Sequence, residues 1–224
     1  LDLMKMAGMV EESIDNTIIA LKNQDVELAR KIFRNDDIID EMEQIIEKRC
    51  LMLIARQQPL AKDLRTISTA LKIITDMERI ADHSADIAEI TIRMAHQKYV
   101  KPLIDLPKMA ELAKHMVEKS IDAYVKQDIE LAKEVCESDN EVDALFFKIV
   151  LELTSLIKND VQTAEQAVDL MFVAKYLERM ADHATNISEW VIFNVTGEHE
   201  HLATQLHRDD HINNHFIEDN FDDQ

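Results

Sequence analysis

Hydrophobic residues recur every three or four positions along most of the chain, which is the period of an α-helix with one buried face. One such stripe consists of Ile73, Met77, Ile80, Ser84, Ile87 and Thr91. Interruptions such as Asn-Gln-Asp and Arg-Gln-Gln-Pro divide the pattern into helices, and Gly197 is expected to end the last one. The predicted helices span about Leu3–Lys22, Asp25–Ile54, Leu60–Gln97, Lys108–Lys126, Asp128–Ile157 and Ala164–Val195.

The two halves of the chain repeat one another. Residues 78–89, ERIADHSADIAE, match residues 178–189, ERMADHATNISE, at seven of twelve positions. DVELA at 25–29 likewise corresponds to DIELA at 128–132, and DDIID at 36–40 to DNEVD at 139–143. A period of about 100 residues is too long for a solenoid. We therefore predict an all-α fold of two tandem three-helix bundles related by internal duplication. The expected divisions are a first repeat at 1–97, a linker at 98–107, a second repeat at 108–197 and a tail at 198–224.

Composition supports this class of fold and restricts the partners. Two glycines and three prolines among 224 residues are too few for a turn-rich β protein. The formal net charge of -19 disfavours nucleic acids and anionic lipid surfaces as partners. Two cysteines do not form a disulfide framework, which fits a reducing cytoplasm. The longest apolar run, CLMLIA at 50–55, is too short to span a bilayer, so we expect no direct membrane insertion.

The repeated segment carries paired acids on one face of a helix. Residues four apart lie one above the other, so Glu78 and Asp82 project side by side, as do Glu178 and Asp182. Such like-charged pairs cost a helix about 0.2–0.5 kcal/mol. A chain with 44 acidic residues contains many such pairs by chance, but these recur at the same positions of both halves. The repetition indicates a specific use for the charged face.

The second helix of each half offers facing acids. In the first half they are Asp36, Asp40, Glu43 and Glu47. In the second half only the first two persist, followed by apolar residues: Asp139, Asp143, Phe146 and Val150. Four carboxylates from two facing helices would form an oxygen cage suited to Mg²⁺, Ca²⁺, Mn²⁺ or iron. Alternatively, the acids form a solvated flank that pairs with Arg79 and Arg179.

Further residues could support such a site. His83 and His183 directly follow the second acid, and adjacent helical positions point about 100° apart. We therefore expect them to orient ligands or bond between helices rather than bind metal directly. The same supporting role is open to Asp86, Glu89, Asn186 and Glu189. In the tail, His207, His211 and His215 could bind a transition metal if helical, and a disordered acidic tail is the alternative.

Taken in order, these motifs resemble the PhoU family of bacterial phosphate-system regulators. The resemblance also rests on ARQQPLAKDLR at 55–65 and VTGE at 195–198, and it covers residues 4–198. It implies two three-helix bundles with multinuclear metal clusters, iron being the expected metal and Mn, Mg, Zn and Ca the alternatives. Carried over residue by residue, the ligands of one cluster are Asp36, Asp40, Glu78 and Asp82. Those of the other are Asp139, Asp143, Glu178 and Asp182. Asn186 replaces the acid found at Asp86, which predicts different or weaker metal binding in the second half.

The resemblance also implies a function. It predicts a cytoplasmic, homodimeric negative regulator of phosphate uptake and of the phosphate-starvation response. Such a protein would act as an adaptor between a phosphate ABC transporter and a sensor histidine kinase. One alternative is a non-haem di-iron carboxylate enzyme, but these use Glu-x-x-His twice, and here the spacing occurs only at Glu198 and His201. We therefore expect no enzyme. The other alternative is a metal-free helical interaction protein, in which the repeated carboxylates would be exposed.

Overall fold

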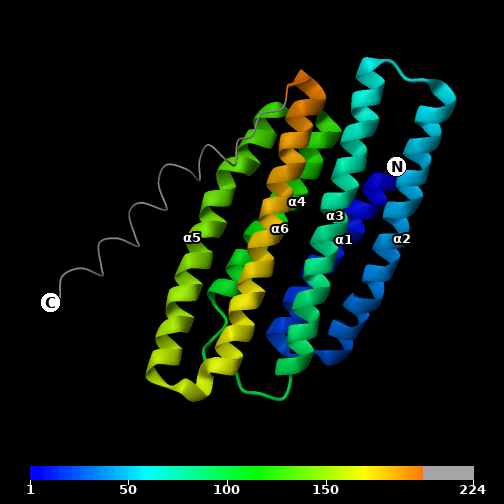
Figure 1. The fold of residues 1–224 in the computed structure, drawn as a ribbon. Coiled ribbons are helices and arrows are strands. Elements are labelled where there is room, and N and C mark those ends of the chain that lie inside the picture. Colours follow the sequence, from blue (N-terminus) through cyan, green and yellow to red (C-terminus); the bar gives the residue numbers. More distant parts are fainter. Residues whose placement is uncertain (199–224) are drawn as a thin grey trace.

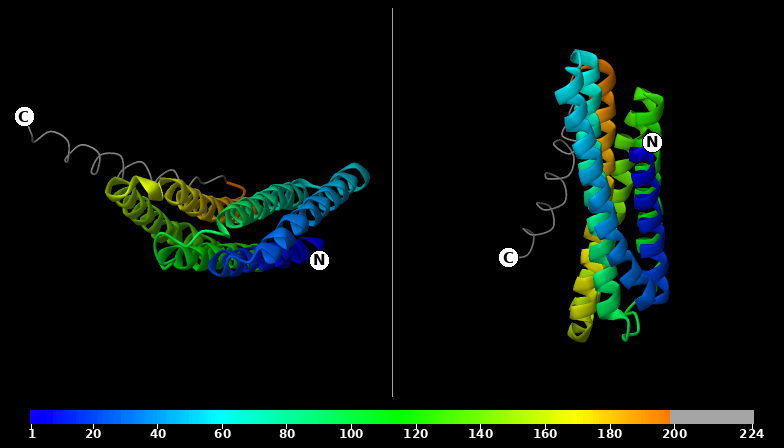
Figure 2. Two further views of the ribbon diagram at one scale, coloured as in Figure 1. Left: turned by 90° about the horizontal axis from the view of Figure 1, so that it is seen from below. Right: turned by 90° about the vertical axis from the view of Figure 1, so that its right-hand side faces the viewer.

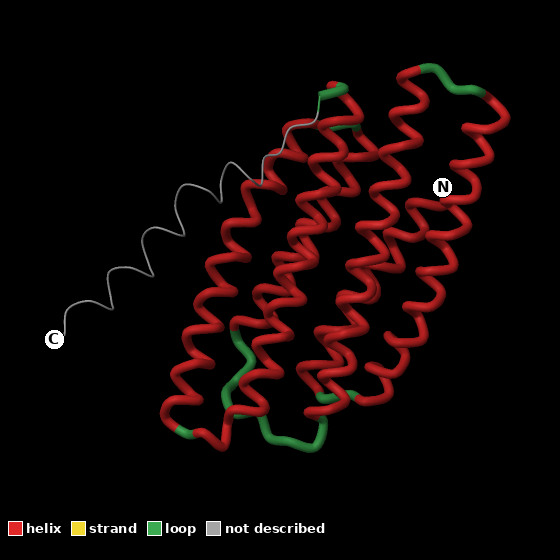
Figure 3. Tube along the Cα trace, viewed as in Figure 1, coloured by secondary structure: helices red, strands yellow, loops and turns green. Residues whose placement is uncertain are grey.

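The computed structural model describes residues 1–198, and within this range it contains six long α-helices, one short 3₁₀-helix and no strand (Figure 3). The helices are α1 Asp2–Asn23, α2 Val26–Gln57, α3 Ala61–Met94, α4 Asp105–Lys126, α5 Ile129–Asn159, η1 Val161–Thr163 and α6 Ala164–Thr196. The expected all-α fold is confirmed. The tail histidines discussed above lie outside the described residues. None of the described helices combines the length and apolarity needed to cross a bilayer.

The duplication extends to the turns that begin α2 and α5. Asp25 and Asp128 cap these helices, each side chain accepting a hydrogen bond of 3.0 Å from the backbone N–H three residues later. The preceding Gln24 and Gln127 adopt left-handed backbone angles, with φ of 51° and 55°. An aspartate cap after a left-handed residue ends one helix and starts the next within a single tight turn. The expected start of α2 near Asp25 is therefore confirmed, and its counterpart in the second half has the same geometry.

The connection between the halves differs from the sequence-based expectation. Helix α3 ends at Met94 rather than Gln97, and α4 begins at Asp105 rather than Lys108. Pro107 therefore lies in the first turn of α4 instead of the linker. Proline is tolerated there because the first N–H groups of a helix have no carbonyl acceptor within the helix. The connecting segment is correspondingly residues 95–104.

The helices form two layers. In Figure 1, α5, α6, α3 and α2 lie side by side, with α4 and α1 behind them. The end view in Figure 2 shows α1 and α4 together on one side of α3 and α6. One hydrophobic cluster takes buried side chains from all six long helices, including Met77 of α3 and Leu177 of α6, both 0% exposed. The two repeats therefore share a continuous core at their junction, with α3 and α6 at its centre.

Polar contacts also connect the halves across this junction. Arg93 of α3 donates hydrogen bonds of 3.2 and 2.5 Å to the buried carboxylate of Asp169 in α6. Lys114 of α4 donates to both carboxylate oxygens of Asp15 in α1, at 2.7 and 2.8 Å. A half-buried pair holds its partners more firmly than an exposed one, because less water competes for the charges. These pairs fix the antiparallel alignment of α3 with α6 and of α1 with α4.

The end of α6 is held by the start of α3. Gly197 ends α6 with a φ of 84°, as expected for the helix stop. The Arg65 guanidinium fills the space beside it, so that a Cβ at position 197 would lie 2.4 Å from Arg65 Nη1. Arg65 Nε also donates to the backbone oxygen of Asn194 at 3.0 Å. A cation is favourable at this position because the last carbonyls of a helix carry partial negative charge.

Candidate metal centre

The first acidic cluster lies between α2 and α3. Asp36 and Asp40 stand one turn apart on α2 and face Asp82 of α3. One carboxylate oxygen from each of these three residues lies within 4.8 Å of the other two. Asp36 Oδ1 and Asp40 Oδ1 are buried and have no hydrogen-bond partner among the described residues. Buried polar atoms normally have a partner, so these two oxygens are acceptors that require a proton, a hydrogen-bond donor or a cation.

The electrostatics of this cluster reflect mutual repulsion in a partly dry site. Burial raises the pKa of Asp36 to about 7, and the charges of Asp82, Asp40 and Glu78 add to the shift. Burial also raises the pKa of Asp40, with Asp82 adding to it. The pKa of Glu78 rises to about 6, first by burial and then by Asp82. A cation bound among these groups would instead lower the pKa of each carboxyl, because it favours the charged form of every carboxylate.

Neighbouring side chains satisfy only part of the cluster. Arg79 lies 3.4 Å from Glu78 Oε2 and 3.1 Å from Asp82 Oδ2. Thr75 donates a hydrogen bond of 3.0 Å to Glu43, the third acid of the α2 stripe. Glu47, the fourth, is exposed. Pairing with Arg79 therefore accounts for the two acids of α3 but leaves the buried oxygens of Asp36 and Asp40 unexplained.

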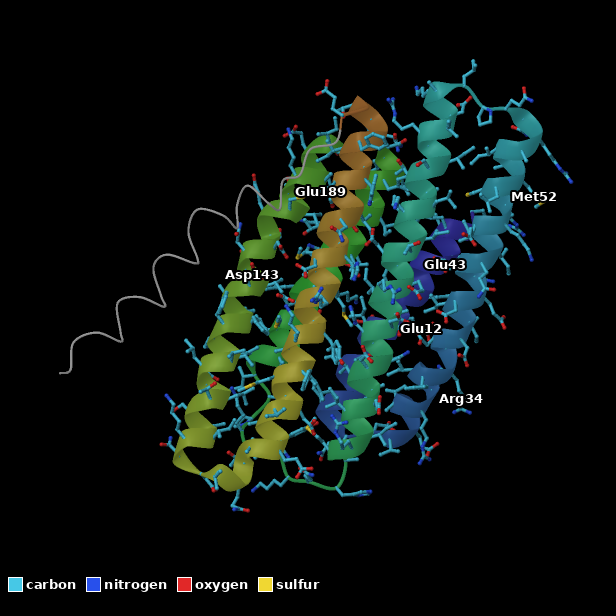
Figure 4. All side chains as sticks on the ribbon, in the orientation of Figure 1. Glu12, Arg34, Glu43, Met52, Asp143 and Glu189 are labelled. Carbon is cyan, nitrogen blue, oxygen red and sulfur yellow. The ribbon has the colours of Figure 1, made fainter. Side chains whose placement is uncertain are left out.

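The second cluster occupies the matching place between α5 and α6, at the opposite edge of the layer. Figure 4 shows Asp143 on α5 and Glu43 on α2 at these two edges. Asp139 is buried at 5% exposure, and the Glu178 side chain is 13% exposed. Burial raises the pKa of Asp182 to about 6, and Glu178 adds to the shift. In the described part of the chain, three acids from different turns converge within 4.8 Å only in the first cluster.

The donor set suits hard cations. All the converging atoms are carboxylate oxygens, which Mg²⁺, Ca²⁺, Mn²⁺ and iron accept and soft metals disfavour. The first centre fits such an ion on two grounds: carboxylate oxygens from two helices converge, and Asp36 and Asp40 each have a buried oxygen without a partner among the described residues. A cation there would bridge α2 and α3. In the second centre the corresponding acids are Asp139, Asp143, Glu178 and Asp182.

The two histidines lie at the junction of α3 and α6. His83 stacks on Tyr176 with ring centroids 5.4 Å apart, and its Nδ1 is 3.4 Å from Asp86 Oδ2. His183 Nδ1 is 2.8 Å from Asp76 Oδ1 of the other half. The two imidazole rings are 5.6 Å apart. Positions 76 and 176 correspond in the repeat, as do 83 and 183, so the contacts reflect an approximate two-fold relation between the halves. Burial lowers the pKa of His83.

The remaining candidate residues differ in burial between the two halves. Glu89 is exposed, whereas its counterpart Glu189 is buried at 7% exposure. Glu189 lies near Cys136, whose thiol pKa is raised to about 12 by burial and further by the Glu189 charge. Asn186 is exposed and donates to Asp76 at 3.4 Å, on the side of α6 that faces α3. Asn186 therefore takes part in the junction of the halves, and its effect on metal binding in the second half stays a prediction.

Sequence reasoning did not identify three residues that shape these sites: Thr75, Asp76 and Lys175. Lys175 donates to both carboxylate oxygens of Glu178, at 2.6 and 2.5 Å. Thr75 contacts Glu43, and Asp76 contacts His183. A signal was available, because the repeats disagree just before the matching acids, with Thr-Asp at 75–76 and Lys-Tyr at 175–176. Positions at which the two repeats differ can make contacts specific to one half. A comparison restricted to identical positions does not reveal such residues.

Comparison with known proteins agrees with both the repeat and the fold. The family model described as "PhoU domain" matches residues 3–91 and again residues 106–191. The Clostridium acetobutylicum protein named "Phosphate-specific transport system accessory protein PhoU homolog" is 40% identical over 197 residues, covering 88% of this chain and 90% of that protein. The Aquifex aeolicus protein of the same name is 41% identical, covering 89% and 92%.

Solved structures give the same result. The crystal structure of PhoU from Pseudomonas aeruginosa is similar with a TM-score of 0.85 at 31% identity, covering 88% of this chain and 95% of that one. The phosphate transport system regulatory protein PhoU from Streptococcus pneumoniae gives a TM-score of 0.83 at 25% identity, covering 89% and 94%. The duplicated three-helix pattern, the match of both halves and the likeness over most of the chain establish that this protein belongs to the PhoU family.

Proposed function

We propose that this chain is an accessory, regulatory protein of a phosphate-specific transport system. Its relatives carry that description, and the similarity extends over most of both chains. More specifically, we propose a cytoplasmic adaptor between a phosphate ABC transporter and a sensor histidine kinase, which represses the phosphate-starvation response. The long helices offer wide faces for such contacts, and the proposal includes a homodimer. We assign no catalytic activity to it.

We further propose that the two acidic clusters bind metal, as multinuclear centres with iron as the first expectation. The observation that carries this is the pair of buried, unpartnered oxygens of Asp36 and Asp40, two residues whose carboxylates converge with that of Asp82. A bound cation would supply the positive charge that the cluster lacks and would connect neighbouring helices. Manganese, magnesium, calcium and zinc are the alternatives. The acids themselves hold the ion, and Arg79 steadies the two on α3.

The alternative of a metal-free interaction protein requires exposed carboxylates. Instead, Asp36, Asp40 and Asp82 are partly buried, and Asp139 is buried. Keeping like charges close in a partly dry site costs stability unless a proton or cation compensates them. A di-iron enzyme remains disfavoured because the helical body contains no Glu-x-x-His pair.

Elemental analysis of the purified protein tests the metal proposal. We expect more than one metal ion per chain in the unsubstituted protein. Glu78→Ala/Asp82→Ala should remove the metal of the first half only, and Glu178→Ala/Asp182→Ala that of the second half only. Glu27→Ala/Glu130→Ala is a matched control, since both acids are exposed and lie outside the clusters. A protein that is metal-free in every form, even after incubation with Fe²⁺ or Mn²⁺, would contradict the proposal.

A deletion strain tests the regulatory role. Without this protein, genes for phosphate scavenging should be expressed even in phosphate-rich medium, because the repressing contact is lost. Reporter-gene activity measures this, and supplying the unsubstituted chain should restore repression. Normal repression in the deletion strain, in a host with no second copy of the gene, would refute the role. If repression is lost in the deletion strain, complementation with Glu78→Ala/Asp82→Ala shows whether metal contributes to repression.

A further inference from the structure

The two acidic clusters differ at one pair of facing positions. In the first half, Glu43 of α2 faces Thr75 of α3, and Thr75 donates a hydrogen bond of 3.0 Å to Glu43. In the second half the corresponding residues are Phe146 and Lys175. The four acids proposed as metal ligands in the first cluster all have acidic counterparts in the second. The exchange therefore removes a carboxylate and adds an ammonium group next to the four acids that the two halves have in common.

Lys175 is directed into the second cluster. Its Nζ lies 2.6 and 2.5 Å from the two carboxylate oxygens of Glu178, whose side chain is only 13% exposed. The same ammonium lies 5.3 Å from the ring centroid of Phe146, close enough for a cation–π contact. Its charge also lowers the pKa of Asp182, partly opposing the effect of burial. The position of Lys175 thus depends on Glu178 and Phe146 together.

This arrangement changes the charge that an incoming ion meets. The first cluster has five carboxylates at corresponding positions, including Glu43, whereas the second has four carboxylates and one ammonium. Arg79 and Arg179 occupy corresponding positions of the two halves, so Lys175 is an additional cation of the second half. A metal that uses the oxygens of Glu178 must first displace Lys175 from them. Breaking a charge-assisted hydrogen bond and adding a nearby positive charge both oppose metal binding.

We propose that Lys175 is a built-in counterion that makes the α5–α6 centre the weaker metal site of the two. The inference rests on the proposed metal function and names the residue that makes the centres unequal. In the α2–α3 centre Arg79 pairs with the two acids of α3, whereas the α5–α6 centre has the corresponding arginine, Arg179, and in addition its own lysine. At limiting metal the first centre fills before the second. Loss of a charge-assisted contact corresponds to about a tenfold change in dissociation constant, which is the expected size of the effect.

Titration of the metal-stripped full-length chain with MnCl₂, followed by calorimetry and by the signal of free Mn²⁺ in electron paramagnetic resonance, tests this. Asp36→Asn/Asp40→Asn silences the first centre, so that the second is measured alone. In that background, Lys175→Thr, which restores the residue of the first half, should tighten Mn²⁺ binding about tenfold. Lys175→Arg retains the charge and should remain close to the background. Thermal melts of the stripped proteins confirm that each variant is folded.

The reciprocal exchange provides an independent comparison. With the second centre silenced by Asp139→Asn/Asp143→Asn, Thr75→Lys should weaken Mn²⁺ binding at the first centre by a similar factor. Equal Mn²⁺ affinity with threonine and lysine at position 175 would overturn the role of Lys175 while leaving metal binding intact. A second centre that fails to bind Mn²⁺ even with threonine at 175 would overturn it as well. Absence of binding at both centres of the unsubstituted chain would instead refute the metal proposal itself, and this inference with it.

Discussion

Replacing Asp36 with asparagine is expected to stabilise the metal-free protein by about 1–2 kcal/mol at about pH 7.5. The carboxyl of Asp36 is partly buried beside three other acids, and its pKa in the folded protein is raised to about 7. Ionising it in the folded state therefore costs free energy that ionising it in the unfolded chain does not. The expected value is smaller than the full difference in pKa would imply, because the side chain remains partly open to water.

The sign of the pH dependence follows from the same shift. Between about pH 4 and pH 7 the folded protein holds a proton on Asp36 that the unfolded chain has released. The stabilising contribution of the protonated form is complete below the unfolded pKa and is lost as the pH rises through the folded pKa. Glu78, with a pKa raised to about 6, acts in the same direction. The metal-free protein should therefore become less stable from about pH 4 to pH 7, and less steeply so in Asp36→Asn.

Urea unfolding of metal-stripped protein at several pH values measures this effect. Glu27→Gln is the matched control, since it removes an exposed acid outside the cluster and should leave the pH slope unchanged. Adding Mn²⁺ should stabilise the unsubstituted protein at neutral pH and have less effect on Asp36→Asn, because the variant has lost a ligand. An identical pH slope for the unsubstituted protein and Asp36→Asn would show that burial and the neighbouring acids do not raise the pKa of Asp36 in solution.

Replacing Leu177 with alanine should destabilise the protein by about 2–5 kcal/mol. The side chain is 0% exposed and lies in α6, within the cluster that takes buried residues from all six long helices. Its loss removes apolar burial and leaves a cavity that rigid neighbouring helices fill only in part. Because the halves share this core, the change should lower the stability of both together.

Two probes separate this outcome from independent unfolding of the halves. Trp190 is the only tryptophan; it packs against the shared core from α6 and its ring centroid lies 5.6 Å from Lys72 Nζ of α3, so its fluorescence reports on α6 and its junction with the first half. Far-UV circular dichroism reports on the helices of both halves. We expect the two urea transitions to coincide before and after the substitution. Val168→Ala, at a position 43% exposed, should change stability by no more than about 0.5 kcal/mol. Separate transitions would mean that the halves are independent folding units.

Local chemistry in the sequence was sufficient to predict the elements of this fold. The hydrophobic period predicts six long helices, Asp25 and Asp128 mark the starts of two of them, and Gly197 ends the last. These features depend on neighbours within a few residues, so they can be read without knowing the packing. The sequence pattern predicts too late a start for α4, because two prolines at 102 and 107 are typical of a linker, although a proline also fits the first turn of a helix.

The sequence by itself also determined which acids could meet, because a spacing of four places side chains on one helical face and the repeat singles out which faces are used. Only the tertiary structure decided how those faces meet. The unpartnered oxygens of Asp36 and Asp40, the contact of His183 with Asp76 and the insertion of Lys175 beside Glu178 arise from the packing of helices against one another. Antiparallel alignment of α3 and α6 also places Arg93 at Asp169 and Arg65 at the end of α6. Such contacts depend on the rotation and offset of whole helices, which the shared core sets and which no short stretch of sequence encodes.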